Sequence, residues 1–318
     1  MVFPSLLFII GFIILIKSAD ILIKGASSFA NRLRVTSWLI GVTIVGIGTS
    51  IPEFTITVFS AIRGTFDIGL GTIIGSNTLN LLFILGICAI IRPLVLKKDW
   101  ILKGLPPNIL SVAVAAYLLI SPFAGDKTFY GITKPEGIIL TFIFLCWLSY
   151  VVLRKRPSEI ETQPVALVPL KKALLMVTVG LIGVIVGGEW VVGSAIVIAE
   201  FFGISHALIG LTIVGIGTSL PELAVSALAA YRKQFGIAVG NIVGSNIFDF
   251  LGILGVASLF QPIPFPQTLL IDVFFTLFSA ILLFLAMFTD KKYVLSRLQG
   301  VFFVFIYLVY LLYILQRG

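Results

Sequence analysis

Long apolar stretches alternate with short polar ones along the whole chain. A helix needs about 20 consecutive apolar residues to cross a bilayer, and stretches of about this length occur ten times in the 318 residues. We therefore expect an all-α polytopic membrane protein of the cell membrane. The ten predicted spans are 2–23, 37–62, 68–91, 105–122, 136–153, 173–198, 206–231, 237–260, 267–288 and 296–315.

The composition supports this class and excludes others. Hydrophobic residues make up 59% of the chain and charged residues only 11%, whereas soluble domains carry roughly 25% charged residues. Soluble, disordered and nucleic-acid-binding proteins are therefore excluded. Cys88 and Cys146 both lie within apolar stretches, so neither a disulfide framework nor a cysteine metal site is expected.

The net charge of +8 reports orientation, because the basic residues lie in short loops and cytoplasmic loops retain an excess of Lys and Arg. With the N-terminus outside, 17 basic residues fall in inside loops and 4 in outside segments. Both termini are therefore predicted to face outward. The polar stretch 154–172 is read as a cytoplasmic linker, too short for a folded regulatory domain.

The sequence repeats itself at an offset of 169 residues. Gly41–Glu53 matches Gly210–Glu222 at 11 of 13 positions, and Gly71–Gly86 matches Gly240–Gly255 at 9 of 16. We expect a first five-span repeat at 1–153 and a second at 173–318, separated by the linker 154–172. Because five is odd, the second repeat enters the membrane inverted. Inverted repeats are typical of secondary transporters, whose site lies near the midplane at the repeat interface.

Duplication for packing alone is the alternative interpretation. The identity, however, is concentrated on Gly, Thr, Ser, Pro and Glu in mid-membrane, residue types of little use on a lipid-facing helix. Transport is therefore the favoured interpretation of the repeat.

The second predicted span carries oxygen-bearing side chains at helical spacing. Thr49 and Glu53 are four residues apart and Ser50 is three from Glu53, so a helix would place them on one face. Pro52 lacks an N–H and is expected to bend the helix and free the carbonyl of Gly48. Backbone carbonyls freed at membrane depth persist only in protein interiors or wet cavities, where they can bind cations.

Three further spans contain related residues. The seventh repeats the arrangement, and the third and eighth add serines, asparagines and an aspartate. For Ser76, Ser245, Asn77 and Asn246, hydrogen bonding to the backbone of a broken helix is almost as good an interpretation as ion binding. The seventh span contains Gly215, Gly217, Thr218, Ser219, Pro221 and Glu222, the third contains Ser76, Asn77 and Asn80, and the eighth contains Ser245, Asn246 and Asp249.

Three carboxylates, Glu53, Glu222 and Asp249, lie in mid-membrane. An ionisable residue there costs at least roughly 2.5–3.5 kcal/mol and so indicates function; interhelical bonding of protonated carboxyls is the alternative. The surrounding groups are all oxygen ligands, which favours hard cations such as Ca²⁺, Na⁺ or Mg²⁺ over zinc or copper.

These motifs resemble a known family. The two GIGTS-[IL]-PE segments and the paired GSN-x-x-[ND] segments, on ten spans in two halves, resemble the α-repeats of the sodium/calcium exchanger branch of the cation/calcium exchanger superfamily. The resemblance implies a prokaryotic-type member with two α-repeats, because the Ca²⁺-sensing insert of animal members is absent. The proton/calcium branch usually reads GN-x-x-E where this chain reads GTS-x-PE, which favours sodium as the coupling ion.

The resemblance also implies a ligand set. Carboxylate, hydroxyl and amide ligands would line the ion sites, Gly46 and Gly215 would offer backbone carbonyls, and Ser76 and Ser245 would match further Na⁺ ligands. The metal ligands proper would be Glu53, Glu222, Thr49 and Thr218. The remaining ion-binding residues implied are Ser50, Ser219, Asn80 and Asp249.

The function implied is an antiporter that exchanges about three Na⁺ for one Ca²⁺, electrogenically, by sliding the first and sixth spans across the bundle. Na⁺ and Ca²⁺ are the substrates, no cofactor is expected, and the chain is expected to act as a monomer in the bilayer. A proton/calcium exchanger and, less favoured, a cation channel remain alternatives. An intramembrane protease is not expected, because Asp249 has no aspartate at its repeat position and His206 lies alone at a span boundary.

Charge arithmetic gives the exchange a physical basis. Three ionised carboxylates carry −3, which three Na⁺ neutralise and one Ca²⁺ does not, unless Asp249 keeps a proton. Only a charge-compensated site crosses the low-dielectric core cheaply, so either ion load permits switching and the empty site does not.

Other acidic residues are expected to be structural. Asp20 and its repeat counterpart Glu189 lie near opposite membrane faces; they either attract cations or, as we favour, form local ion pairs. The remaining aspartates lie at span ends, where we expect their side chains to contact solvent: Asp67, Asp99, Asp126, Asp272 and Asp290.

Overall fold

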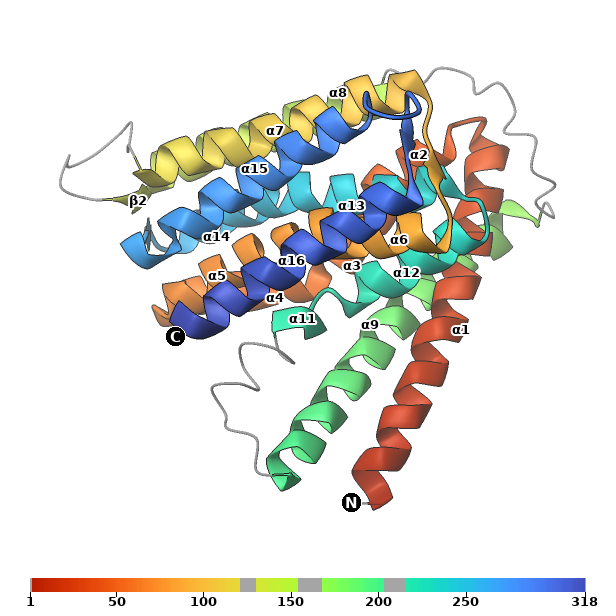
Figure 1. Ribbon diagram of the computed structural model, residues 1–318, viewed down its shortest axis with the longest axis horizontal. Coiled ribbons are helices and arrows are strands. Elements are labelled where there is room, and N and C mark those ends of the chain that lie inside the picture. Colours follow the sequence, from red (N-terminus) through yellow and green to blue (C-terminus); the bar gives the residue numbers. More distant parts are fainter. Residues whose placement is uncertain (1, 121–129, 154–167, 203–214, 318) are drawn as a thin grey trace.

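The computed structural model describes residues 2–120, 130–153, 168–202 and 215–317, and these are almost entirely helical (Figure 1). Six long helices have no break of the kind found in the others. They are α1 (Val2–Leu33), α7 (Lys98–Ile120), α8 (Lys134–Leu153), α9 (Leu170–Phe201), α15 (Leu270–Ala286) and α16 (Arg297–Arg317).

The other predicted spans consist of shorter pieces. The second span is α2 (Ser37–Ile40), the π-helix η1 (Gly41–Val45), α3 (Gly46–Thr49) and α4 (Ile51–Arg63). The third is α5 (Phe66–Thr78), the π-helix η2 (Leu79–Ile84) and α6 (Leu85–Ile91). The described part of the seventh is α11 (Gly215–Gly217) and α12 (Leu220–Tyr231). The eighth is α13 (Phe235–Ile247), the π-helix η4 (Phe248–Ile253) and α14 (Leu254–Phe260), and a 3-10 turn, η5 (Gln267–Leu269), precedes α15.

The helical membrane fold is confirmed, but the count of ten is not. Eight described helices are long and apolar enough to cross a membrane, and a ninth span is the α2–α4 segment, which is bent by 47°. The start of the predicted seventh span and His206 fall within 203–214, outside the described residues. Most of the linker 154–172 is also outside the described residues. The linker and the domain limits stay predictions.

The first helix is longer than predicted. We expected it to end at residue 23, but α1 continues to Leu33. Lys24 bonds Asp20 on the same helix at 2.7 Å, so the polar residues there are paired and do not end the helix.

Helices α1 and α9 pack side by side, antiparallel, and project from the rest of the bundle (Figure 1). Small residues allow the close approach, as is common between membrane helices. A methyl group on Gly11 would lie 3.0 Å from the backbone nitrogen of Val191, and one on Gly180 would lie 2.8 Å from the backbone of Leu22. Gly180 and Val191 are the repeat counterparts of Gly11 and Leu22, so the two contacts are related by the internal two-fold symmetry.

The same symmetry relates two small β-bridges. β1 (Leu94–Val95) pairs antiparallel with β4 (Val294–Leu295), and β2 (Gly131–Ile132) with β3 (Ile263–Pro264). Each pair joins one repeat to the other. These crossed connections hold the halves together outside the central helices, and no sequence pattern predicted them.

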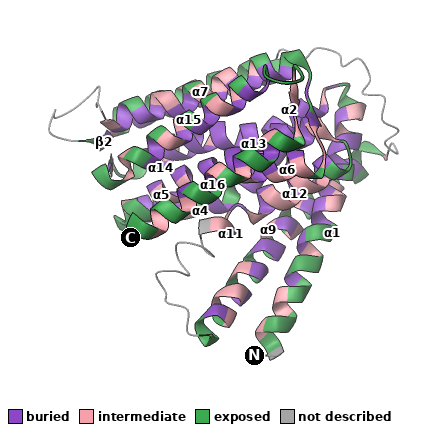
Figure 2. Ribbon diagram, viewed as in Figure 1, coloured by how far each residue is buried: buried purple, intermediate pink, exposed green. Residues whose placement is uncertain are grey.

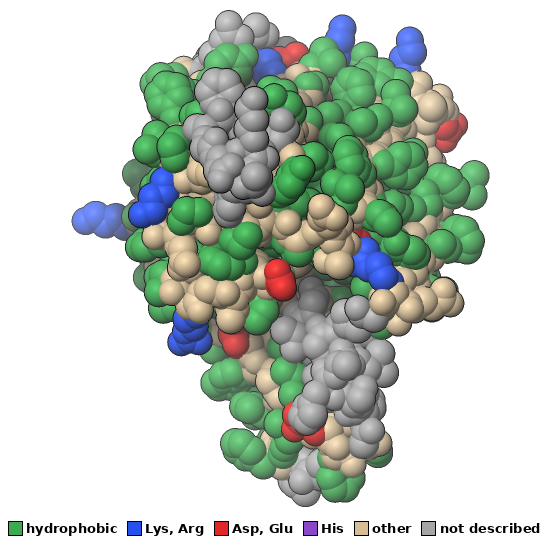
Figure 3. All heavy atoms as spheres, turned by 90° about the vertical axis from the view of Figure 1, so that its left-hand side faces the viewer, with side chains coloured by type: hydrophobic (Ala, Val, Ile, Leu, Met, Phe, Trp, Pro, Cys, Tyr) green, Lys and Arg blue, Asp and Glu red, His purple; other side chains and the backbone are tan. Residues whose placement is uncertain are grey.

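The core is formed by the broken helices, and the long helices cover it. Every residue of α13 from Gly236 to Ile247 is buried (Figure 2). The long helices expose apolar side chains, among them Leu153 at 81% and Leu298 at 80%. Figure 3 shows the end of the bundle that carries β2 and the C-terminus, where hydrophobic side chains cover much of the surface and charged ones are scattered. A surface of this kind suits a lipid environment.

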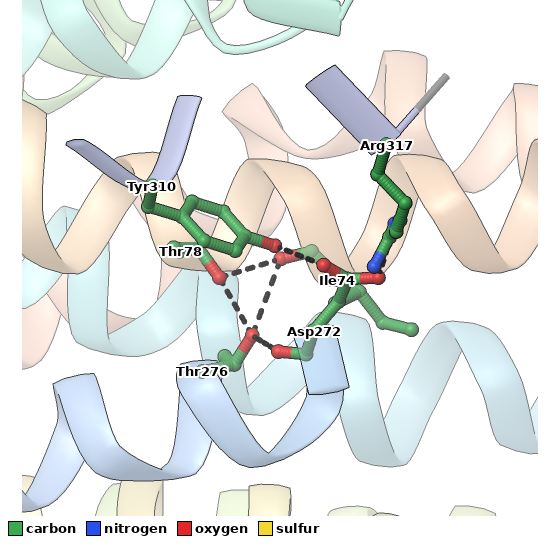
Figure 4. A network of polar contacts seen from close by, with 6 residues as sticks. All are labelled: Ile74, Thr78, Asp272, Thr276, Tyr310 and Arg317. Atoms are coloured by element: carbon green, nitrogen blue, oxygen red, sulfur yellow. Dashed lines mark hydrogen bonds and ion pairs between the residues drawn. The ribbon is translucent and has the colours of Figure 1, made fainter. Parts of the chain in front are cut away.

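Asp272 is not solvated, contrary to expectation. Its side chain is only 4% exposed, and it accepts hydrogen bonds from Tyr310 at 2.8 Å and Arg317 at 2.8 Å (Figure 4). Thr276 continues the network to Thr78 on α5 at 2.6 Å. A carboxylate one turn inside a span is stabilised by a cation and a hydroxyl from the facing helix, partners that sequence position does not reveal.

The two halves depart from symmetry around α5 and α13. A methyl group on Gly244 of α13 would collide with the carbonyl of Val42 on η1, whereas no described residue comes within 4 Å of such a group on its counterpart Gly75 on α5. Gly75 instead lines a cavity of about 640 Å³. The described residues therefore approach Gly75 less closely than they approach Gly244.

This difference predicts opposite outcomes for the same substitution. Gly244→Ala should lower the apparent melting temperature in detergent by about 2–6 °C, because the packed backbone of Val42 cannot move aside. Gly75→Ala should leave it unchanged or raise it slightly, since Ala favours the helix and its methyl group would meet no described atom within 4 Å. Equal losses in thermal unfolding scans of the two purified variants would contradict the asymmetry.

A buried cluster of carboxylates, hydroxyls and amides

The helix breaks where proline was expected to break it. α3 ends at Thr49, α4 begins at Ile51, and Ser50 between them has φ −81° and ψ 11°. Pro52 cannot donate to the carbonyl of Gly48. We predicted that Thr49, Ser50 and Glu53 share one face of a single helix. This is wrong in detail, because Thr49 ends one helix and Glu53 lies in the first turn of the next. That position suits a carboxylate, since helix N-termini are electropositive.

The second repeat contains the same break. α11 ends at Gly217, Ser219 has φ −90° and ψ 6°, and Glu222 lies in the first turn of α12. The two breaks meet in the protein interior. The hydroxyl of Ser50 donates to Oε1 of Glu222 at 3.5 Å. The hydroxyl of Thr49 also lies beside Glu222, and reciprocally that of Thr218, the counterpart of Thr49, lies beside the carboxylate of Glu53.

Asn80 and Asp249 lie on the π-helices η2 and η4, a conformation that is rare and often found at functional sites. Asn77 donates to Asp249 at 2.7 Å, and Asn80 donates to Asn246 at 3.0 Å. Asn246 and Asp249 are the repeat counterparts of Asn77 and Asn80, so the two bonds are two-fold mates. Asn77 and Asn246 thus connect the repeats and orient the central pair.

The serines and glycines of the predicted set differ between halves. Ser245 donates to the carbonyl of Gly46 at 3.0 Å and lies 3.5 Å from Glu222. Ser76 donates within its own helix, to the carbonyl of Ile73 at 3.2 Å. Gly215 is the first residue of α11.

The three carboxylates are deeply buried and lack counter-charges. Glu53, Glu222 and Asp249 are each 1% exposed. Each has one buried oxygen without a hydrogen-bond partner among the described residues, as do Asn80 and Ser219. No described Lys or Arg lies within ion-pair distance of any of the three. Buried charges without partners are unfavourable, so the cluster requires cations or protons.

A cation here would take most of its ligands from neutral oxygens. Among the described residues, no three Asp, Glu, His or Cys side chains converge on one ion position. Thr49 and Ser50 are 0% exposed and both lie beside Glu222. Hydroxyl, amide and carbonyl oxygens therefore supplement the carboxylates, a donor set suited to Na⁺ or Ca²⁺.

Asn241 is a member of the cluster that sequence reasoning missed. It accepts a hydrogen bond from Thr49 at 3.0 Å and donates to Ser226 at 2.9 Å. It also donates to the backbone carbonyl of Glu222, at 3.4 Å. Its repeat counterpart is Thr72, so the comparison of the two repeats did not single it out. The one sequence signal that could have done so is an asparagine within an apolar span.

The chain matches the sequence profile of the sodium/calcium exchanger protein family over residues 3–153 and 172–316. The chain belongs to this family. The match covers both repeats and includes every described residue of the cluster. The family assignment made from the doubled motif is thereby confirmed.

Individual relatives agree with this assignment. The chain is 34% identical to the inner membrane protein YrbG of Escherichia coli, over 82% of this chain and 81% of YrbG. It is 28% identical to the sodium/calcium exchanger MaX1 of Methanosarcina acetivorans, over 95% and 96% of the two chains. The solved structure of the sodium-calcium exchanger NCX_Mj soaked with zero Na⁺ and Ca²⁺ superposes with a TM-score of 0.84 at 32% identity, covering 97% of this chain and 98% of that one.

The position of Asn241 predicts a role in shaping the cluster. Asn241→Ala should leave Thr49 without its partner and weaken cation binding about tenfold, as loss of a group that orients ion ligands does. Thr72→Ala should have little effect, because the Thr72 hydroxyl bonds only its own helix, at Ile68. The shift of the melting temperature with added Ca²⁺ measures both; equal shifts in the two variants would contradict this role.

Proposed function

We propose that the protein is an antiporter that exchanges Na⁺ for Ca²⁺ across the cell membrane by alternating access. The observation that carries the proposal is the set of three buried carboxylates without a described counter-charge, among hydroxyl, amide and carbonyl groups, where the two inverted repeats meet. The family membership supports the same reading.

The ligand roles follow from the reciprocal geometry. Glu53 with Thr218, and Glu222 with Thr49, form two equivalent half-sites, which we assign to Ca²⁺. Ser50, Ser219, Asn80 and Asp249 complete the central region, and Ser76, Ser245 and the carbonyls of Gly46 and Gly215 supply further Na⁺ ligands. Sharing of the same carboxylates makes Na⁺ and Ca²⁺ binding mutually exclusive.

Charge compensation couples binding to switching. With all three carboxylates ionised the cluster carries −3, which three Na⁺ neutralise and one Ca²⁺ reduces to −1. A compensated cluster crosses the low-dielectric interior at lower cost than a charged one. Exchange of about three Na⁺ for one Ca²⁺ would move one net positive charge per cycle.

The asymmetry of the bundle supports alternating access. The cavity of about 640 Å³ is lined by Gly75 and Thr218, and a second cavity of about 130 Å³ is lined by Thr218, Pro52 and Glu189. Both are bordered by Thr218 of the cluster, and we take the side on which they lie as the open side. Loop charges assign this open side to the exterior, with both termini outside.

Removal of either glutamate charge should abolish exchange. Glu53→Gln and Glu222→Gln should each reduce Na⁺-driven Ca²⁺ flux in proteoliposomes by at least about 100-fold, because a shared ligand of both ions is lost. Both variants should remain folded, since a neutral amide at this depth relieves an uncompensated charge. Asp290→Asn, at an exposed loop, is the control and should be fully active. A fully active glutamate variant would refute the assignment.

Coupling to sodium has its own test. Vesicles loaded with Na⁺ should take up ⁴⁵Ca²⁺, and an inside-positive potential should accelerate uptake, because three Na⁺ leave for each Ca²⁺ that enters. Uptake that ignores internal Na⁺ but follows a pH gradient would identify a proton/calcium exchanger. Uptake without any counter-ion gradient would identify a channel.

A further inference from the structure

Two acid–base pairs outside the cluster are related by the repeat. Asp20 on α1 corresponds to Glu189 on α9, and Arg232 at the end of α12 corresponds to Arg63 at the end of α4, all at the offset of 169. Each pair would join a projecting helix to the helix that carries a cluster glutamate. The structure shows them in different states.

The first pair is formed. Arg232 contacts the carboxylate of Asp20, whose side chain is 21% exposed. Lys24 already bonds Asp20 from the same helix, so Asp20 does not need Arg232 for local neutralisation. The contact with Arg232 instead accompanies packing of α1 on α12 and ties the two helices together at the end of the bundle where Arg232 lies.

The second pair is open. No described Lys or Arg lies within ion-pair distance of Glu189. Lys24, which bonds Asp20, is replaced by Gly193 in the second repeat, so Glu189 has no basic partner one turn along its helix. Arg63 lies over the ring of Phe59, 5.8 Å from its centroid. Helix α9 does not pack on α4 as closely as α1 packs on α12. Glu189 lines the cavity of about 130 Å³ that also borders Thr218.

We propose that Asp20 and Glu189 are alternately neutralised acidic residues at the two mouths of the ion pathway. In the present state Arg232 holds Asp20 and closes one mouth, while Glu189 is free and attracts cations into the passage to Thr218. In the opposite state Arg63 pairs with Glu189, and Asp20 loses Arg232 and faces its own mouth. This inference rests on the exchange function proposed above.

The physical basis is the long range of an unpaired charge. A carboxylate at a narrow mouth with low-dielectric walls concentrates cations and speeds their association, an effect that salt screens. An ion pair removes that field. The exchange of partners therefore gives the open mouth a negative charge and cancels it at the closed mouth.

The first test reads the access state without transport. In a background of Cys88→Ala and Cys146→Ser, the reporters are Ile56→Cys, which lines both cavities, and Val225→Cys, its 0% exposed counterpart. Labelling of each by a membrane-impermeant thiol reagent is timed at fixed Na⁺ and Ca²⁺. Asp20→Asn or Arg232→Ala should slow labelling of the Ile56→Cys reporter and speed that of Val225→Cys, each roughly two- to fivefold, as loss of a half-exposed ion pair implies.

Arg63→Ala should produce the reverse shift, and the exchanged pair Asp20→Arg with Arg232→Asp should restore the original rates. Shifts in the same direction for Arg232→Ala and Arg63→Ala, or no shift, would overturn the alternating pairing. Because labelling does not require exchange, this outcome is independent of the proposed function.

The second test concerns cation attraction. Glu189→Gln should raise the half-saturating Ca²⁺ concentration on the Arg63 side roughly two- to fivefold at low ionic strength, with the difference vanishing when choline chloride is added. The opposite side should be unaffected, and Asp20→Asn should act on that side alone. An equal change on both sides, or one that added salt does not diminish, would overturn this role of Glu189.

Discussion

The structure depends on the burial of three carboxylates that the protein itself does not neutralise. Glu53, Glu222 and Asp249 lie at the centre of an apolar bundle with no described basic partner. An Arg or Lys placed beside them would neutralise their charge and stabilise the fold. The chain uses this solution at Asp272, which pairs with Arg317. Because the central carboxylates lack such a partner, the stability of each access state in the proposed exchange would depend on the ions bound.

That constraint accounts for the departures from regular helix. A continuous helix would satisfy its own carbonyls and present few oxygens, whereas the breaks at Ser50 and Ser219 and the π-turns at Asn80 and Asp249 expose backbone and redirect side chains. These departures are tolerated because the broken pieces are enclosed by the long helices. The outer helices can therefore be regular and apolar, and the inner ones irregular and polar.

This division also explains what the sequence predicted. Apolar length located the long helices, and the repeat at 169 residues with Pro52 and Pro221 located the breaks, because these signals are local. The partner of Asp272, the role of Asn241 and the π-turns were missed. Each depends on which helices face one another, as with Tyr310 and Asp272, and a single chain records that only indirectly. Helix α1 extended past its predicted end for a similar reason, since Lys24 and Asp20 satisfy each other.

The described residues are arranged less symmetrically than the doubled motif, and the inversion explains why this matters. A contact that ties one side has a counterpart that would tie the other, as Asp20 with Arg232 has in Glu189 and Arg63. If both sides closed at once the cluster would be sealed from both solutions, and if both opened the bundle would lose its packing and conduct ions. Two states of similar energy, each packed on one side only, are therefore what an inverted repeat with a central charged site provides. In the exchange proposed above, ions that bind at the centre would need to supply little energy to favour one state over the other.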